Sequence, residues 1–136
     1  SAFFTKASAD PSGQLMMSLE GLNWDASVTA ASFAEDGPFR VFIWTPTQGR
    51  MGDVYQTFME AKAIHEKLGA RVNIYNEGIG GSGNIHYVMS WKDWATMAKS
   101  GDAIAASPEF RALQASAAGQ ATPVGSIQGF PVYYTK

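Results

Sequence analysis

The sequence contains no cysteine, and this absence removes several kinds of chemistry at once. A disulfide framework, a thiolate nucleophile and a zinc or iron–sulfur site with cysteine ligands are all excluded. Because disulfide usage is the usual mark of an oxidising compartment, the localisation stays unknown on this ground. The cytoplasm is the favoured expectation, and a leader removed ahead of Ser1 is compatible with the sequence.

Charged residues are also scarce, at 16% of a chain of 136 residues, against an average of about 25%. Ten Lys and Arg stand against twelve Asp and Glu, and no basic run occurs, so we expect no nucleic-acid partner. No apolar run approaches the roughly 20 residues that cross a bilayer, so we expect no membrane partner either. The low charge together with 12% aromatic residues favours a homodimer or a higher homo-oligomer.

The sequence does contain four runs that are typical of strands. The clearest is FRVFIWT at 39–45, rich in aromatic and β-branched residues and followed by proline. Alternation with a period of two predicts strands over 71–77 and 84–90, joined by the glycine-rich segment GIGGSG. A last strand is expected over 124–134, at an edge or bulged, because glycine and proline interrupt it.

Helical signals lie between these strands. Apolar residues recur at helical spacing over 53–68, and Gly69 is placed as the usual C-terminal stop. Ser90 and Asp93 fit a capping box, which predicts a helix from this point to about Lys99, where Ser100-Gly101 interrupts it. A second helical piece is expected from Ser107-Pro108 to Ala118.

The order strand, helix, strand, strand, helix, strand predicts an α+β class with a ferredoxin-like βαββαβ unit. Its sheet is antiparallel with both helices on one face, which leaves the other face uncovered in a monomer. We place this domain at residues 38–136. Residues 1–37 are interpreted as an N-terminal extension packed on it, because they hold too many large apolar side chains for a free tail.

Four stretches resemble a known group of proteins: FRVFIWTP, the helix end His65 to Ala70, YVMSWKDWATMA, and SPEFRAL. Over residues 38 to 134 the chain resembles the dimeric α+β barrels, which include antibiotic-biosynthesis-type monooxygenases, NIPSNAP-like and EthD-like proteins. The resemblance implies that two sheets pack face to face in a homodimer and that each subunit keeps a pocket between its sheet and helices. It implies no particular subfamily and carries over no catalytic set.

The segment Gly78-x-Gly80-x-x-Gly83 matches the GxGxxG spacing of dinucleotide-binding loops. Such a loop needs a helix directly after it, with its N-terminus facing the pyrophosphate. The residues that follow alternate as a strand does, so we interpret the glycines as a hairpin connection and expect no bound cofactor. A continuous helix over 84–98 would reverse this interpretation.

His65 is the candidate catalytic residue, because it lies in the middle of the apolar stripe of the first helix and titrates near neutrality. There it would face the sheet and any pocket beneath it, where it could act as a general base. Two other readings stay open: a core histidine held by one hydrogen bond, and a haem ligand. The chain has two histidines, placed on different sides of the sheet, so we expect no metal site.

The predicted ligand-binding residues are Phe58 on the first helix, Tyr87 and Met89 on the 84–90 strand, and Trp91 just after it. The opposite sheet face is expected to carry a second set and to form the dimer contact: Phe42, Trp44, Asn73, Tyr75 and His86. Stacking of this aromatic face on RNA bases is the disfavoured reading, given the acidic balance.

Two functions follow from these patterns. The first is a homodimeric protein that binds a small apolar or aromatic ligand between sheet and helices. The resemblance adds the expectation of cofactor-independent monooxygenase or proton-transfer chemistry, with His65 as base. The alternative is a non-catalytic structural or assembly protein that uses the aromatic sheet face and the extension for subunit contacts. A ligand-sized pocket beside His65 favours the first, and a solid core there favours the second.

Overall fold

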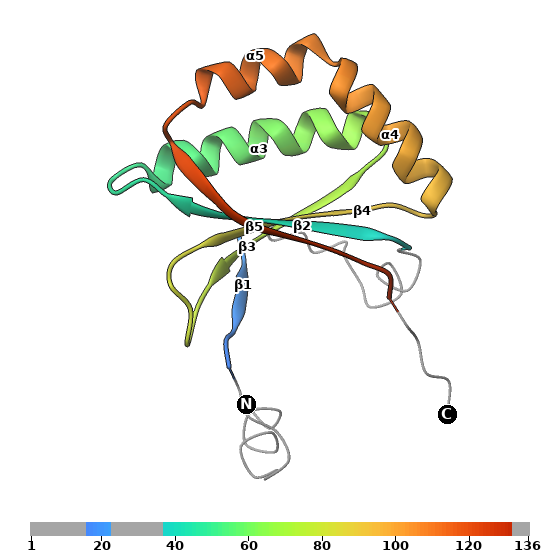
Figure 1. Ribbon diagram of the computed structural model, residues 1–136. Coiled ribbons are helices and arrows are strands. Elements are labelled where there is room, and N and C mark those ends of the chain that lie inside the picture. Colours follow the sequence, from blue (N-terminus) through green and yellow to red (C-terminus); the bar gives the residue numbers. More distant parts are fainter. Residues whose placement is uncertain (1–15, 23–36, 132–136) are drawn as a thin grey trace, which may run out of the picture.

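One antiparallel sheet with helices on one face makes up the part of the chain described by the computed structural model, residues 16–22 and 37–131 (Figure 1). The sheet order is β1-β3-β4-β2-β5. The strands are β1 (Leu19–Gly21), β2 (Phe39–Pro46), β3 (Arg71–Glu77), β4 (Ile85–Ser90) and β5 (Ala121–Gly129). The helices are α3 (Met51–Lys67), α4 (Trp94–Ala106) and α5 (Pro108–Ser116).

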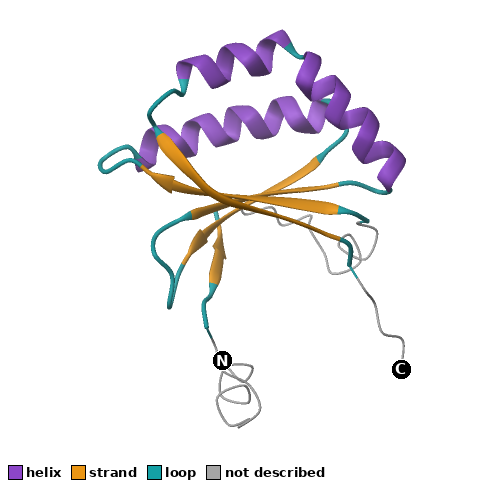
Figure 2. Cartoon of the chain, viewed as in Figure 1, coloured by secondary structure: helices purple, strands orange, loops and turns teal. Residues whose placement is uncertain are grey.

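From β2 onward the chain runs strand, helix, strand, strand, helices, strand, and β2 and β4 are the central pair of the four. The predicted α+β class and the ferredoxin-like βαββαβ order are therefore confirmed, with helices on a single face of the sheet (Figure 2). The helical half of the second crossover is divided into α4 and α5, which meet at Ser107. Ser107 caps α5 by accepting a hydrogen bond from the Phe110 amide at 3.1 Å.

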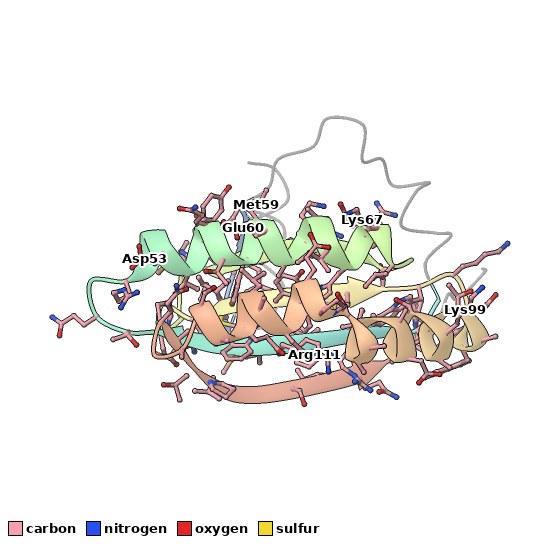
Figure 3. The ribbon with its side chains drawn as sticks, turned by 90° about the horizontal axis from the view of Figure 1, so that it is seen from above. Asp53, Met59, Glu60, Lys67, Lys99 and Arg111 are labelled. Atoms are coloured by element: carbon pink, nitrogen blue, oxygen red, sulfur yellow. The ribbon has the colours of Figure 1, made fainter. Side chains whose placement is uncertain are left out.

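The first helix follows its predicted pattern. α3 begins at Met51, two residues before the expected start, and its C-terminus is followed by Gly69 at φ +96°. The predicted polar positions are exposed, including Asp53, Glu60 and Lys67, which Figure 3 labels along the helix. The predicted inward stripe is buried or half-buried: Val54, Phe58, Ala61, His65 and Leu68.

The start and the end of the next helix differ from the prediction. Ser90 is the last residue of β4, and Asp93 is the N-cap of α4, where its carboxylate accepts from the Thr96 amide at 2.7 Å. The helix also runs through Ser100-Gly101 without a break. Ser100 is buried and lies against the turn at Gly69. Because Ser100 and Gly69 are both small, α4 can approach the end of α3 closely. Packing thus outweighs the cost of about 1 kcal/mol for a glycine inside a helix.

The register of the sheet decides which side chains face the helices. Phe42 and Ile74 both pair with Tyr87, and Trp44 pairs with Ile85, so these side chains share one face. This is the face beneath α3, because Phe58 of that helix contacts the rings of Trp44 and Tyr87. The prediction that Phe42 and Trp44 lie on the opposite face was wrong. The alternation of β2 was correctly read, but its two sets were assigned to the wrong sides.

The glycine-rich segment connects β3 and β4 as a hairpin, and no helix follows it. Glu77, at the end of β3, organises this connection, since its carboxylate accepts hydrogen bonds from the Ser82 and Asn84 amides at 2.7 and 3.2 Å. Gly80 has φ +77°, and a Cβ there would collide with the Met16 carbonyl. The glycines therefore serve a tight turn, which removes the structural context of a dinucleotide fingerprint.

The last strand begins earlier than predicted and pairs with β2 at the edge of the sheet. Its register shifts between Ile43 and Trp44, which pair with Gly125 and Pro123, so the bulge expected from this glycine and proline content is present. Residues 132–134 of the predicted strand lie outside the described residues. At the other edge, β1 pairs with β3 through Leu19 and Glu77. The division at residue 37 stays a prediction.

Candidate functional site

A cavity of about 860 Å³ lies between the sheet and the helices, within the range of roughly 300–1,000 Å³ typical of small-molecule sites. Its floor is formed by side chains of β2 and β4, and one wall by α3. The rest is formed by Trp91, α4, α5, the segment after α5, and Ala121 and Gln128 of β5. Figure 3 shows α3 and α5 beside each other above the sheet. α4, which precedes α5 in the chain, lies next to the N-terminal end of α5. Most of the lining is apolar or aromatic, as a ligand of low polarity requires.

The floor and the α3 wall meet at a hydrogen-bonded pair. His65 Nδ1 and the Tyr87 hydroxyl oxygen lie 2.8 Å apart, and each residue is at most 5% exposed. In either tautomer the Nε2 atom of His65 is buried without a partner among the described residues. The alternative of a core histidine with a single hydrogen bond fits this contact, but His65 also lines the cavity.

Both members of this pair are neutral at pH 7. Burial lowers the pKa of His65 from its ordinary value of 6.5 to about 4, because imidazolium loses hydration there. Burial also raises the pKa of Tyr87 well above its usual range, and the nearby Glu66 carboxylate adds to this shift. The pair therefore offers hydrogen-bonding groups without charge.

Aromatic rings surround the pair. The Phe58 ring meets Tyr87 edge-on at 5.3 Å between centroids and Trp44 at 6.1 Å. From the helical side, Phe110 of α5 contacts the His65 ring at 4.5 Å. Such edge-to-face contacts fix ring orientation, and each stabilises the fold by about 0.5–1.5 kcal/mol beyond the effect of burying the rings. The base of the cavity is therefore a rigid aromatic cluster.

The end of the cavity near α4 is different in character. Trp91 lies in its wall, 5% exposed, and its Nε1 donor has no partner among the described residues. Trp94 is half exposed and stacks on Phe130 at 6.3 Å. Arg40 of β2 lies at this end too, where its Nη2 donates to Gln128 Oε1 at 2.7 Å.

All five residues proposed from the sequence line this cavity: His65, Tyr87, Phe58, Met89 and Trp91. Their roles in binding or catalysis stay predictions. The sequence interpretation missed Arg40, Phe42 and Trp44, because it assigned their side of β2 to the other face. It also missed Phe110 of α5 as a neighbour of His65.

His86 projects from the other face of the sheet, as its alternation with Tyr87 requires. Its Nε2 lies 2.8 Å from Glu77 Oε1, and both side chains are less than 10% exposed. This hydrogen bond is the largest cause that lowers the pKa of Glu77 from 4.5 to about 2, and the amides of Ser82 and Asn84 contribute in the same direction. His86 is therefore part of the hairpin's own structure.

Within residues 16–22 and 37–131 no three His, Asp or Glu side chains cluster as metal ligands would. In the same residues no helix is both long and apolar enough to cross a bilayer.

No protein-family model matches the sequence, and no curated protein matches it either. Among the solved structures similar in fold are two NIPSNAP proteins. A NIPSNAP family protein of unknown function from Agrobacterium tumefaciens superposes with a TM-score of 0.61 at 10% identity, over 74% of this chain and 93% of that one. An uncharacterized NIPSNAP domain protein from Burkholderia xenovorans gives a TM-score of 0.58 at 15% identity, over 71% and 94% of the two chains.

This chain has the ferredoxin-like α+β fold of those NIPSNAP proteins. At identities this low the likeness concerns the fold alone. The resemblance noted from the sequence is thus confirmed for the fold, and it extends to no subfamily, dimer or reaction.

Proposed function

We propose that this protein binds a small apolar or aromatic molecule in the cavity between its sheet and its helices. The observation that carries the proposal is the aromatic cavity of about 860 Å³ with a neutral His65–Tyr87 pair at its base. Ligand sites typically combine apolar walls with a few placed polar groups. The Nε1 donor of Trp91, which has no partner among the described residues, is one further polar group in the same wall.

A reaction in this site would be oxygenation or proton transfer without a tightly bound cofactor, with His65 as base. A histidine whose pKa is about 4 is deprotonated at pH 7, but it accepts a proton weakly. The lowered pKa of His65 therefore favours binding over base catalysis, and we propose binding as the primary function.

A cavity-filling variant tests the proposal. Gly101 lies in α4 and lines the cavity, and a Cβ placed on it meets no atom within 4 Å. Gly101→Phe should therefore place a ring in the cavity without a backbone clash. Gly52 is a matched control, because it is a helical glycine with equally open surroundings outside the cavity lining.

Binding of the neutral probe 2-naphthamide is measured by isothermal titration calorimetry. We expect the wild type and Gly52→Phe to bind it with similar affinity and Gly101→Phe to lose binding at least tenfold. Equal binding by all three proteins would place the probe elsewhere and contradict the proposal.

The second candidate is a structural or assembly protein, and it is favoured by the sheet face that carries no helix within residues 16–22 and 37–131. On that face Val41 pairs with Val88 and with Ile127, and Ile127 is 54% exposed. We propose that a second copy of the chain packs here, as the dimeric barrels would. Ile127→Glu should then reduce the mass in light scattering from two chains to one. The matched control is Ile79→Glu, at a residue 69% exposed on the hairpin.

A further inference from the structure

Arg40 is the one permanently charged residue among the described side chains that line the cavity. It belongs to β2 and faces the helices, because its strand position alternates with Val41 on the other face. All other lining groups are apolar, aromatic, amide, hydroxyl or the neutral imidazole of His65. A half-buried cation in such surroundings calls for an anionic partner.

The protein supplies no such partner within its described residues. Within the described residues Arg40 makes one side-chain hydrogen bond, to the neutral Gln128, and its guanidinium lies 5.9 Å from the centre of the Phe42 ring. None of the ion pairs in the described part of the chain includes it. A guanidinium has five N–H donors in a planar fork, so donors are left for a ligand.

The position of Arg40 along the floor sets the size of that ligand. Arg40 pairs with Met89, and Phe42, two residues further along β2, pairs with Tyr87. Two residues of an antiparallel strand span about 7 Å. The backbone positions of Arg40 and of the Phe42–Tyr87 pair are therefore about 7 Å apart along an apolar floor, which is comparable to the length of a small aromatic body.

We propose that the cavity is specific for an organic carboxylate, whose apolar body lies over Phe42 and Met89 and whose carboxylate binds the Arg40 guanidinium. This inference rests on the proposed function and adds the charge of the ligand to it. One cation without a second basic group matches a monoanion, and the fork geometry of arginine matches the two oxygens of a carboxylate. A phosphate ester, with more charge and more acceptor oxygens, would find too few donors.

A pair of isosteric probes tests the inference: 2-naphthoate, which is anionic at pH 7.5, and neutral 2-naphthamide. We expect the wild type to bind the carboxylate about tenfold more tightly, because charge-assisted hydrogen bonds exceed neutral ones by about this factor. Arg40→Met should remove the preference and keep the affinity for the amide within about twofold. The charge-matched control is Lys99→Met, since Lys99 is exposed on α4 and outside the cavity lining (Figure 3).

The outcomes separate the two proposals. Equal affinity of the wild type for both probes overturns the inference and leaves the proposed function standing, as does a preference that survives in Arg40→Met. Binding of neither probe overturns the proposed function and the inference with it. The comparison on the wild type needs no variant, so equal affinity for the two probes overturns the inference even where Arg40→Met fails to fold.

Discussion

The Nδ1 atom of His65 and the hydroxyl oxygen of Tyr87 lie 2.8 Å apart, and their hydrogen bond joins α3 to β4. This contact is the polar centre of an otherwise aromatic cluster, with Phe58 and Phe110 packed against its two rings. Because both groups are buried and neutral, the bond fixes the helix on the sheet without placing a charge in the core. The same bond holds two side chains that line the cavity.

Removal of the Tyr87 hydroxyl should therefore weaken the fold. In Tyr87→Phe the Nδ1 atom of His65 loses its partner while buried, which costs about 1–3 kcal/mol. Urea denaturation measures this loss. Tyr55→Phe is the control, since its exposed hydroxyl donates to the Leu22 carbonyl, and we expect a change of at most about 0.5 kcal/mol. Similar small losses in both variants would mean that the His65–Tyr87 bond adds little.

The lowered pKa of His65 predicts a specific pH dependence. Unfolded chains bind a proton at this residue below about pH 6.5, whereas the folded protein binds it only near pH 4. The free energy of unfolding should thus fall as the pH decreases from 6.5 to 4, and this contribution should be constant above 6.5. Titration of the His65 imidazole by NMR checks the folded value directly. A midpoint near 6.5 would contradict the burial of this side chain.

Glu77 titrates in a lower pH range than His65, and its titration acts in the same direction. Its folded pKa of about 2 lies below its ordinary 4.5, so its contribution to stability is complete above pH 4.5 and is lost as the pH falls toward 2. Glu77→Gln leaves one acceptor oxygen for several donors and should cost about 1–3 kcal/mol at pH 7. The variant should also lose less stability than the wild type between pH 4.5 and 2, as measured by urea denaturation at each pH. Parallel pH profiles of the two proteins would contradict the lowered pKa of Glu77 in the folded state.

Substitution by alanine should have opposite effects on stability at two glycines. A Cβ at Gly37 would collide with the backbone carbonyl of Lys92, beside Trp91 in the cavity wall, so Gly37→Ala should cost about 1–3 kcal/mol. Gly101 lies inside α4 with open space around it, so Gly101→Ala should stabilise by up to about 1 kcal/mol. Thermal unfolding of both variants measures the difference. A destabilised Gly101→Ala would mean that this glycine is required for packing.

The sequence predicted the order of elements and the inward stripe of α3, because both depend on local periodicity. It also placed His65, Tyr87 and Met89 toward a common space, since alternation along one strand fixes their relation to each other. It failed for Arg40, Phe42 and Trp44. Alternation divides a strand into two sets, but only the register with β4 decides which set faces the helices.

The continuation of α4 past Ser100-Gly101 could not be predicted from local sequence patterns either. Ser100-Gly101 reads as an interruption, yet the helix continues because Ser100 is buried beside Gly69. That contact joins residues distant in the sequence, and no local pattern encodes it. The division between residues 1–37 and the domain stays a prediction.

The most direct test of ligand binding follows the indole N–H signals of the protein by NMR while 2-naphthamide is added. Trp44, Trp91 and Trp94 line the cavity, and the Trp91 donor has no protein partner among the described residues. Each signal is assigned by a Trp→Phe variant. We predict saturable shifts of these three signals, with the Trp91 signal moving most, and no such shifts in Gly101→Phe. Indole signals that stay unmoved at millimolar probe, or move equally in Gly101→Phe, would contradict a ligand site in this cavity.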